Sequence, residues 1–336
     1  MILLFPIISL VAGFIFIYLS ADSFTDNSAR IASIYKISPL LIGILILGFG
    51  TSAPEMIVSA LAAFEKHPEL AVGNAFGSNI FNIALVLGIT AIIKPIEVKW
   101  KSIKKEWRVL LGFMLIAGFL LWNDSDLSFF DGSILLGLLV AFLVYTYYIS
   151  KKDDHEFDNL PSNVDSSQKW RTWRNLIISL TILLVSAQCI VYGGINIAEY
   201  FGVPDLIIGI TLVALGTSIP ELAVSVRGAF RNQHEMVVGN IIGSNIFNTV
   251  AVLAIPALIS TSDIPLTSTS VISGIWPTYS AFFLDFGFMF ALTVGIGLFL
   301  FVPGIGGKKT HQISQVEGIF FIFVLIVYLS QRLLLL

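Results

Sequence analysis

The sequence predicts an all-α integral membrane protein with ten transmembrane helices, arranged as two five-helix repeats of inverted topology with both termini extracytoplasmic. Three observations carry this prediction: the composition, the placement of the basic residues and an internal repeat. Of the 336 residues, 56% are hydrophobic and only 12% are charged, and the mean hydropathy is +0.89. This composition is typical of a polytopic helical membrane protein. The single cysteine, Cys189, excludes an intrachain disulfide and a metal site built from several cysteines.

Ten apolar runs are long enough to cross a bilayer. The first resembles a signal peptide, but no Lys or Arg precedes it, so we expect it to be an uncleaved membrane helix. The predicted spans lie near residues 2–20, 38–64, 70–94, 106–122, 128–150, 174–200, 204–230, 236–260, 280–302 and 315–335.

The basic residues support this number of spans. Seventeen of the 19 Lys and Arg residues fall in the loops after spans one, three, five, seven and nine, which leaves only Lys66 and Arg332 for the opposite side. Cytoplasmic loops are enriched in Lys and Arg, and a missed or extra span would scramble the alternation. We therefore expect a multi-pass protein of the plasma membrane, the inner membrane in a Gram-negative cell, with both termini outside.

An internal repeat divides the chain. Residues 38–93 align without a gap onto 204–259 at an offset of 166, and about half of the positions are identical, which indicates a duplication. Each half holds five spans, and an odd number makes the second half enter the membrane from the opposite face. We expect residues 1–150 to form the first repeat, 151–173 a cytoplasmic linker and 174–336 the second repeat. The acidic linker lacks the glycine and spacing of a calcium-binding loop, so we interpret it as plain solvated chain.

The first repeated motif places a carboxylate beside a proline within an apolar span. It reads GTSAPE from Gly50 to Glu55 and GTSIPE from Gly216 to Glu221. Proline has no amide hydrogen and clashes with the carbonyl four residues earlier, so backbone carbonyls lose their helical partners and need a cation, a water or a hydroxyl. An ionisable group near the bilayer centre costs roughly 2.5 kcal/mol or more. We therefore predict that Glu55 and Glu221 are cation ligands.

The second motif is rich in asparagine. It reads GNAFGSNIFN from Gly73 to Asn82 and GNIIGSNIFN from Gly239 to Asn248. Ser78 and Asn82 are four residues apart and share a helical face, as do their equivalents in the second copy. The glycines four residues apart in each copy predict a ridge of small residues that another backbone can approach. For Asn74 and Asn79, the sequence leaves packing and ligand roles equally open.

The two motifs offer only oxygen ligands: carboxylates, amides, hydroxyls and carbonyls. No histidine or thiolate lies near them on these helices, which favours hard cations such as Ca²⁺, Na⁺ or Mg²⁺ over Zn²⁺ or copper. Asp285, near the outer end of the ninth span, is a further acid that could either extend to the membrane surface or join a site.

The duplicated pair of motifs, GTSAPE with GSNIFN and GTSIPE with GSNIFN, resembles the two alpha-repeats of the sodium/calcium exchanger family within the cation/Ca²⁺ antiporter superfamily. The resemblance implies four central cation sites and alternating access, in which the first and sixth helices slide past the rest. It implies that Ca²⁺ is bound by Glu55, Glu221 and the carbonyls of Thr51 and Thr217. For the Na⁺ sites and the centre, it adds Ser52, Ser78, Ser218, Ser244, the carbonyls of Gly48 and Ala214, and Asn82 and Asn248.

One position departs from some relatives. K⁺-dependent exchangers place an aspartate where this chain has Asn248, so two carboxylates remain and their charge of −2 would be neutralised by one Ca²⁺ or two Na⁺. The expected function is antiport of Na⁺ against Ca²⁺ by alternating access, electrogenic if the stoichiometry of the family holds. An H⁺/Ca²⁺ or K⁺-dependent antiporter is the alternative, and a cation channel is a more distant one. We expect no enzyme activity, cofactor, nucleic acid or obligate protein partner; the lipid bilayer and the transported ions are the expected partners.

Overall fold

The computed structural model describes residues 3–97, 100–123, 126–150, 166–202, 214–260, 263–265, 281–301 and 312–334. Three predicted features lie outside these residues: linker residues 151–165, the start of the second repeated segment at 204–213, and the basic pair Lys308 and Lys309. The chain forms two compact units. Unit one comprises Met1–Pro54 and Thr146–Gly243, and unit two comprises Glu55–Tyr145 and Ser244–Leu336. Each unit therefore draws on both sequence repeats.

Unit one is built around two long helices and several short ones, which come from both repeats. Its elements are α1 (Leu4–Tyr35), α2 (Pro39–Ile42), the π-helix η1 (Gly43–Gly48), α3 (Phe49–Thr51), α9 (Ser166–Tyr200), α11 (Ala214–Thr217) and α12 (Ile219–Phe230), with most of α13 (His234–Phe247).

Unit two contains the remaining helices and two short pairs of strands. Strand β1 (Ile96–Glu97) pairs antiparallel with β4 (Gln312–Ile313), and β2 (Asp126–Leu127) pairs antiparallel with β3 (Ile264–Pro265). The helices are α4 (Ala53–Phe64), α5 (Pro68–Phe81), η2 (Asn82–Leu87), α6 (Gly88–Ile93), α7 (Trp100–Asn123), α8 (Phe129–Ser150), η4 (Asn248–Val252), α14 (Ala254–Ile259), α15 (Ala281–Phe301) and α16 (Gln315–Leu334); α4 and α8 each have a few residues in unit one.

Several helices have the length and composition of membrane spans. Within the described residues, five qualify without interruption, a sixth candidate is a broken pair, and two shorter apolar helices accompany them. These helices coincide with eight of the ten predicted runs, and α7 covers a ninth. The total of ten spans stays a prediction. The five are Leu4–Tyr35, Leu70–Ile93, Phe129–Tyr148, Gln168–Tyr200 and His234–Ile259; the broken pair is Pro39–Thr51 with Ala53–Phe64; the short helices are Leu284–Phe299 and Gln315–Gln331.

Helix α1 extends well beyond residue 20, where the apolar run of the first predicted span ends. The hydroxyl of Thr25 donates to the carbonyl of Ala21 at 2.7 Å, and Ser28 donates likewise to Phe24 at 2.8 Å, which keeps these polar side chains satisfied within the helix. The helix ends where Lys36 adopts a left-handed conformation, with φ 53°. Helix α9 similarly begins at Ser166, so the last residues of the predicted linker are helical.

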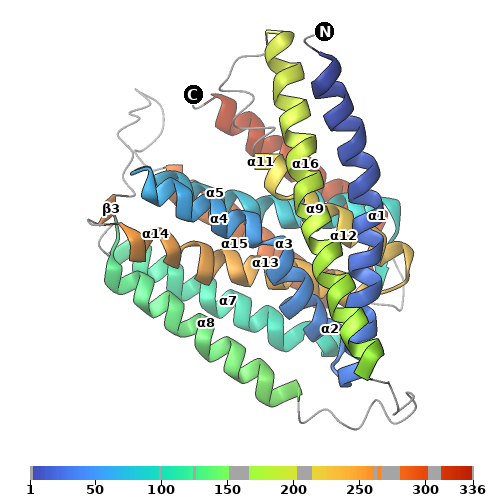
Figure 1. Ribbon diagram of the computed structural model, residues 1–336. Coiled ribbons are helices and arrows are strands. Elements are labelled where there is room, and N and C mark those ends of the chain that lie inside the picture. The colour runs from blue at the N-terminus through green and yellow to red at the C-terminus, as the bar shows by residue number, and fades with distance from the viewer. Residues whose placement is uncertain are drawn as a thin grey trace. The chain divides into compact units, whose positions relative to one another are not determined.

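Helices α1 and α9 run antiparallel along one another (Figure 1). The ring of Phe5 at the start of α1 packs on Tyr192 near the end of α9, whereas Trp173 near the start of α9 donates to the hydroxyl of Tyr35 at 3.0 Å. Glycine permits the close approach: a Cβ atom on Gly193 would lie only 2.6 Å from the carbonyl oxygen of Pro6. The two helices occupy equivalent positions in the two repeats.

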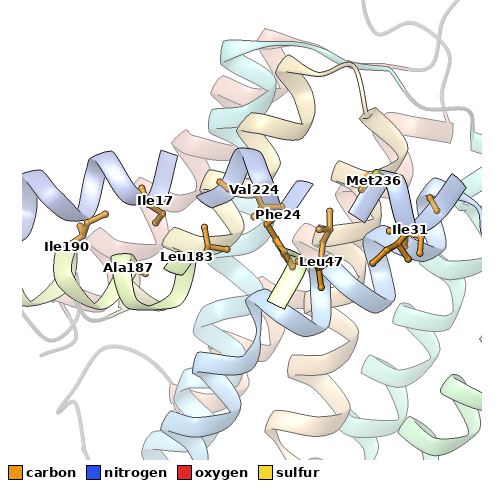
Figure 2. Packing of buried hydrophobic residues seen from close by; sticks show 13 residues of the cluster. Ile17, Phe24, Ile31, Leu47, Leu183, Ala187, Ile190, Val224 and Met236 are labelled. Carbon is orange, nitrogen blue, oxygen red and sulfur yellow. The ribbon is translucent and has the colours of Figure 1, made fainter. Parts of the chain in front are cut away.

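The apolar core of unit one gathers side chains from α1, η1, α9, α12 and α13 (Figure 2). Phe24 of α1 and Leu183 of α9 are fully buried in it, and Val224 of α12 and Met236 of α13 complete its other side. Lipid is as apolar as these side chains, so close packing, and not removal from water, holds such a core together between membrane helices. This core holds the short helices that carry the first motif.

The motif helices are interrupted at equivalent residues. Ser52 lies between α3 and α4, and Ser218 lies between α11 and α12, so both predicted breaks are confirmed. Pro54 and Pro220 each occupy the first turn of the following helix, where a missing amide hydrogen is tolerated.

The second motif has a symmetric irregularity as well. The π-helices η2 and η4 both begin at its last asparagine, Asn82 in the first copy and Asn248 in the second. Single-turn π-helical segments are frequent at functional sites because they rotate side chains out of the regular α-helical pattern.

Candidate functional site

The side chains predicted as ligands are buried. Ten oxygen-bearing side chains from both copies of the two motifs are shielded inside the fold, two of them carboxylates that are fully buried. Burying polar and ionisable groups is unfavourable unless partners or bound ions compensate. The ten are Thr51, Ser52, Glu55, Ser78, Asn82, Thr217, Ser218, Glu221, Ser244 and Asn248.

Two of the four predicted backbone ligands, Gly48 and Ala214, lie two residues before the two copies of the first motif. Gly48 is the last residue of η1, and its carbonyl accepts a hydrogen bond from the amide of Ser52 at 3.1 Å. Ala214 is the first residue of α11.

In unit one, an asparagine joins parts of both repeats. Asn240 of α13 donates from Nδ2 to the hydroxyl of Ser225 on α12 at 3.1 Å, and its Oδ1 lies 3.3 Å from the hydroxyl of Thr51. The Thr51 hydroxyl also donates to the carbonyl of Leu47 at 2.9 Å. Ser225 is one helical turn after Glu221, so Asn240 fixes the helix that carries this carboxylate against the first copy of the motif.

The serines at the two breaks are left with unused hydrogen-bonding capacity. Within the described part of the chain, the buried Oγ atoms of Ser52 and Ser218 have no hydrogen-bond partner. Buried hydroxyls are normally hydrogen-bonded, so an unpartnered pair at equivalent positions calls for an explanation, such as an ion or water. Both serines lie in unit one, as do Thr217 and Glu221.

In unit two, the equivalent asparagine supports Glu55. Asn74 of α5 donates from Nδ2 to the backbone carbonyl of Glu55 at 3.2 Å and lies 3.3 Å from the hydroxyl of Ser59. Asn74 and Ser59 correspond, at the offset of 166, to the Asn240–Ser225 pair of the second repeat. For Asn74, the structure thus shows a supporting contact to the chain that carries the carboxylate.

The last asparagines of the second motif differ from one another. The Nδ2 atom of Asn82 donates to Oδ1 of Asn245 at 3.1 Å, and its own Oδ1 has no partner among the described residues. Asn248 has no hydrogen-bond partner on either amide atom within the same residues. Two buried amides with unsatisfied atoms are an unusual feature of a native core.

The sequence did not predict the roles of Asn240 and Asn245, which lie between the predicted ligands and orient them or their helices. Their signal was their recurrence at the offset of 166, as Asn74 and Asn79. The interpretation that Asp285 could extend to the membrane surface is wrong. Asp285 is only 3% exposed and accepts a hydrogen bond from the hydroxyl of Tyr328 on α16 at 2.9 Å.

The proposed ligands do not include an imidazole or a thiolate. No group of three or more His, Cys, Asp or Glu side chains comes together in the part of the chain that the structure describes. The site residues instead offer hydroxyl, amide, carboxylate and carbonyl oxygens. Such oxygens are the ligands that Na⁺ and Ca²⁺ prefer, whereas zinc and copper sites use imidazole and thiolate groups.

Known proteins share both the sequence and the fold. The profile of the sodium/calcium exchanger protein family matches residues 5–148 and 173–334. The chain is 41% identical over 257 residues to a candidate antiporter, CaxA, of Alkalimonas amylolytica, covering 75% of this chain and 80% of that protein. It is 35% identical over 263 residues to the inner membrane protein YrbG of Escherichia coli, covering 76% and 80%. The sodium-calcium exchanger NCX_Mj, in a structure soaked with Na⁺ and Sr²⁺, superposes with a TM-score of 0.79 at 32% identity, covering 97% and 98% of the two chains.

Proposed function

Because the chain belongs to the sodium/calcium exchanger family, and is therefore a multi-pass membrane transporter and not an enzyme, we propose that it exchanges Na⁺ for Ca²⁺ by alternating access. The observation that supports this most is the buried set of oxygen ligands, contributed at equivalent positions by both repeats. Uncompensated, the two buried carboxylates would be strongly unfavourable in a membrane. Bound cations supply the compensation.

The combined charge of the proposed ligands favours binding of one kind of ion at a time. Glu55 and Glu221 carry −2 when ionised, and the other proposed ligands are neutral. One Ca²⁺ or two Na⁺ neutralise this charge, so an ion of the second kind would add net positive charge to a desolvated site. Competition of this type is what couples the two ions. A third Na⁺ would leave +1, which makes transport sensitive to membrane potential by about 2.3 kcal/mol per 100 mV.

The remaining proposed ligands can be assigned to Na⁺, to Ca²⁺ or to the centre of the site by the type of oxygen that each offers. Hydroxyls and carbonyls suit Na⁺, and we assign to it the serines at the breaks and those of the second motif, with the carbonyls of Gly48 and Ala214. The carbonyls of Thr51 and Thr217 accompany the carboxylates around Ca²⁺. Asn82 and Asn248 contribute amide oxygens at the centre. The neutral amide of Asn248 favours K⁺-independent transport.

The test is Ca²⁺ uptake into proteoliposomes that contain the purified full-length chain and are preloaded with Na⁺. We expect rapid uptake on dilution into Na⁺-free buffer, and none when Na⁺ is equal on both sides. External K⁺ should leave the rate unchanged. Uptake driven by a pH gradient and not by the Na⁺ gradient would replace this proposal with H⁺/Ca²⁺ antiport, and single-channel currents in a planar bilayer would indicate a channel.

We propose that the protein lies in the plasma membrane with the inverted ten-span topology. Both termini then lie outside the cytoplasm. The antiparallel course of the equivalent helices α1 and α9 supports the inversion. Lys66 and Asn232 are equivalent, exposed positions with positive φ, of 66° and 58°, and they provide a matched pair. With Cys189 replaced by serine, a single cysteine at position 66 should react with an impermeant maleimide added outside the cell, and one at position 232 should not. The same labelling of both would contradict the inversion.

A further inference from the structure

The two copies of the GSNIFN segment place four asparagines in unit two, and the copies are bonded differently. Asn79 and Asn245 are equivalent at the offset of 166, as are Asn82 and Asn248, and all four are fully buried. Identical sequence and similar burial would predict the same contacts in both copies. The contacts are not the same, and the difference determines which atom each proposed ligand can present.

Asn245 fixes the orientation of the Asn82 amide. It accepts a hydrogen bond from Nδ2 of Asn82 on its Oδ1 at 3.1 Å, and its own Nδ2 lies 3.5 Å from the backbone carbonyl of Asn79. Rotating the Asn245 amide by 180° would place oxygen against oxygen at that carbonyl and NH₂ against NH₂ at Asn82. The network is consistent in one direction only, which leaves Oδ1 of Asn82 as the atom without a partner among the described residues.

Asn79 does not perform the equivalent function for Asn248. Its Nδ2 donates instead to the hydroxyl of Thr249 at 3.0 Å and lies 3.1 Å from the sulfur of Met289. Thr249 stands where the first repeat has Ile83, which offers no acceptor. The hydroxyl of Thr249 is itself engaged as a donor to the carbonyl of Asn245 at 2.8 Å, so it can only accept from Asn79. The orientation of the Asn248 amide is consequently left unset.

We infer that Asn245 is a positioning residue that holds Asn82 with its amide oxygen available to the transported cation, whereas the Asn248 amide can rotate. The inference rests on the proposed function, since it concerns the ion that Asn82 binds. A cation is attracted to the amide oxygen and repelled by the NH₂ group, so a fixed amide is a better ligand than one that rotates. The first repeat thereby supplies a preorganised neutral ligand, and the second an adaptable one.

The first test replaces Asn245 with leucine, which has a similar volume and no acceptor. Loss of a group that orients a metal ligand typically lowers metal affinity about 10- to 100-fold. We expect Asn245→Leu to raise the KM for Ca²⁺ in Na⁺-loaded proteoliposomes by a factor in this range. Asn79→Leu is the matched control, because it makes the same change at the equivalent position but removes no contact to Asn82. Its KM should rise much less.

A second test separates orientation from general damage to the fold. In Asn82→Asp both terminal atoms are oxygens, so the orientation that Asn245 imposes no longer matters. Asn245→Leu should then raise the KM for Ca²⁺ in the unaltered background and add little in the Asn82→Asp background. Binding of Ca²⁺ to the purified, monodisperse variants in detergent provides the same comparison independently of transport.

An equal rise in KM for Asn245→Leu in both backgrounds, or an equal rise for Asn79→Leu, would overturn the inference and assign Asn245 a purely structural role. An unaltered KM in Asn245→Leu would overturn it as well. All of these outcomes presuppose Na⁺-driven uptake by the unaltered chain. Failure of that uptake refutes the proposed function instead, so the two failures are distinguishable.

Discussion

Three features of the backbone and side chains recur in both repeats, whereas the contacts of α1 do not. Both copies break at a serine before the proline, both tie an asparagine to a serine fifteen residues earlier, and both begin a π-helix at the last asparagine. In contrast, Arg227 and Arg231 of the second repeat form ion pairs with Asp22 and Asp26 of α1. The equivalent positions of these four residues in the other repeat are Leu61, Glu65, Gln188 and Tyr192, which cannot form such pairs.

This difference separates contacts that hold the proposed ion ligands from contacts that distinguish α1 from α9. These are the two helices that the family resemblance describes as mobile. The recurring contacts lie beside the oxygen ligands, although the partners of Asn79 and Asn245 there differ between the repeats. The ion pairs, which do not recur, attach α1 to α12 on the side that the basic residues assign to the cytoplasm. Substitutions in each group of contacts, taken from the largest expected effect to the smallest, test this division.

Removing either carboxylate should have the largest effect. Glu55→Gln and Glu221→Gln each leave a charge of −1, which is too little to hold a dehydrated Ca²⁺, so Na⁺-driven Ca²⁺ uptake should fall to background in both. The exposed Glu65→Gln is the control and should transport normally. Full Na⁺-driven flux in one of the two variants would show that the repeats do not contribute equally.

A glycine in the second repeat is the next most sensitive position. A Cβ atom on Gly239 would lie 2.4 Å from the carbonyl oxygen of Leu40, so the ridge predicted from the sequence is packed against backbone there. Gly239→Ala should destabilise the protein by about 1–3 kcal/mol, measured as thermal unfolding in detergent. Gly137→Ala is the control, because its Cβ would meet no described atom within 4 Å.

The ridge in the first repeat sharpens the same comparison. Gly73 and Gly77 have no described atom within 4 Å of an added Cβ, but the position equivalent to their expected partner Gly43 is Gly209, which lies outside the described residues. The close approach at these glycines therefore stays a prediction. If Gly73→Ala loses about as much stability as Gly239→Ala, another backbone packs closely against Gly73 as well. Unchanged stability would mean that the close approach occurs only in the second repeat.

The ion pairs between α1 and α12 should have a smaller effect. Asp22 receives bonds from both arginines, and Arg227 also lies over the ring of Tyr18, 4.5 Å from its centroid. Partly exposed ion pairs contribute up to about 1 kcal/mol each. Asp22→Arg should lower both the unfolding temperature and the transport rate, and adding Arg227→Asp should restore part of each. Arg30→Gln, which removes a pair within α1 alone, is the control.

The paired asparagine–serine contacts should have the smallest effect. Ser59→Ala and Ser225→Ala each remove one side-chain hydrogen bond between helices, worth about 0.6 kcal/mol in membrane proteins. The two variants should lose the same stability in thermal unfolding, since the contact recurs in both repeats. A loss in only one of the variants would mean that the two equivalent hydrogen bonds contribute differently to the free energy of unfolding.

Much of the helical framework was predictable, because the length of an apolar run and the position of a proline determine where a helix can form and where it breaks. The breaks at Ser52 and Ser218 follow from the prolines two residues later. The end of α1 was not predictable from hydropathy, since Asp22 and Asp26 are tolerated in the helix through arginines about 205 residues away. The local sequence favoured an end where the apolar run ends, and tertiary pairing extended the helix past it.

The candidate site was predictable in its residue types but not in its hydrogen bonds. Recurrence identified the acids, hydroxyls and amides, because duplication preserves them. It could not show that Asn245 orients Asn82 while Asn79 turns to Thr249, since identical segments adopted different partners. Nor did it show that Asp285 pairs with Tyr328 of another helix, because that contact depends on packing between distant segments.

The most direct test of the exchange mechanism is binding of Ca²⁺ to the purified protein at a series of Na⁺ concentrations. If the two buried carboxylates bind either ion but not both, the apparent Kd for Ca²⁺ should rise with Na⁺. On logarithmic axes the slope should reach at least two once Na⁺ is well above its own dissociation constants, because neutralising a charge of −2 takes two Na⁺ in place of one Ca²⁺. An apparent Kd that stays the same at every Na⁺ concentration would contradict it.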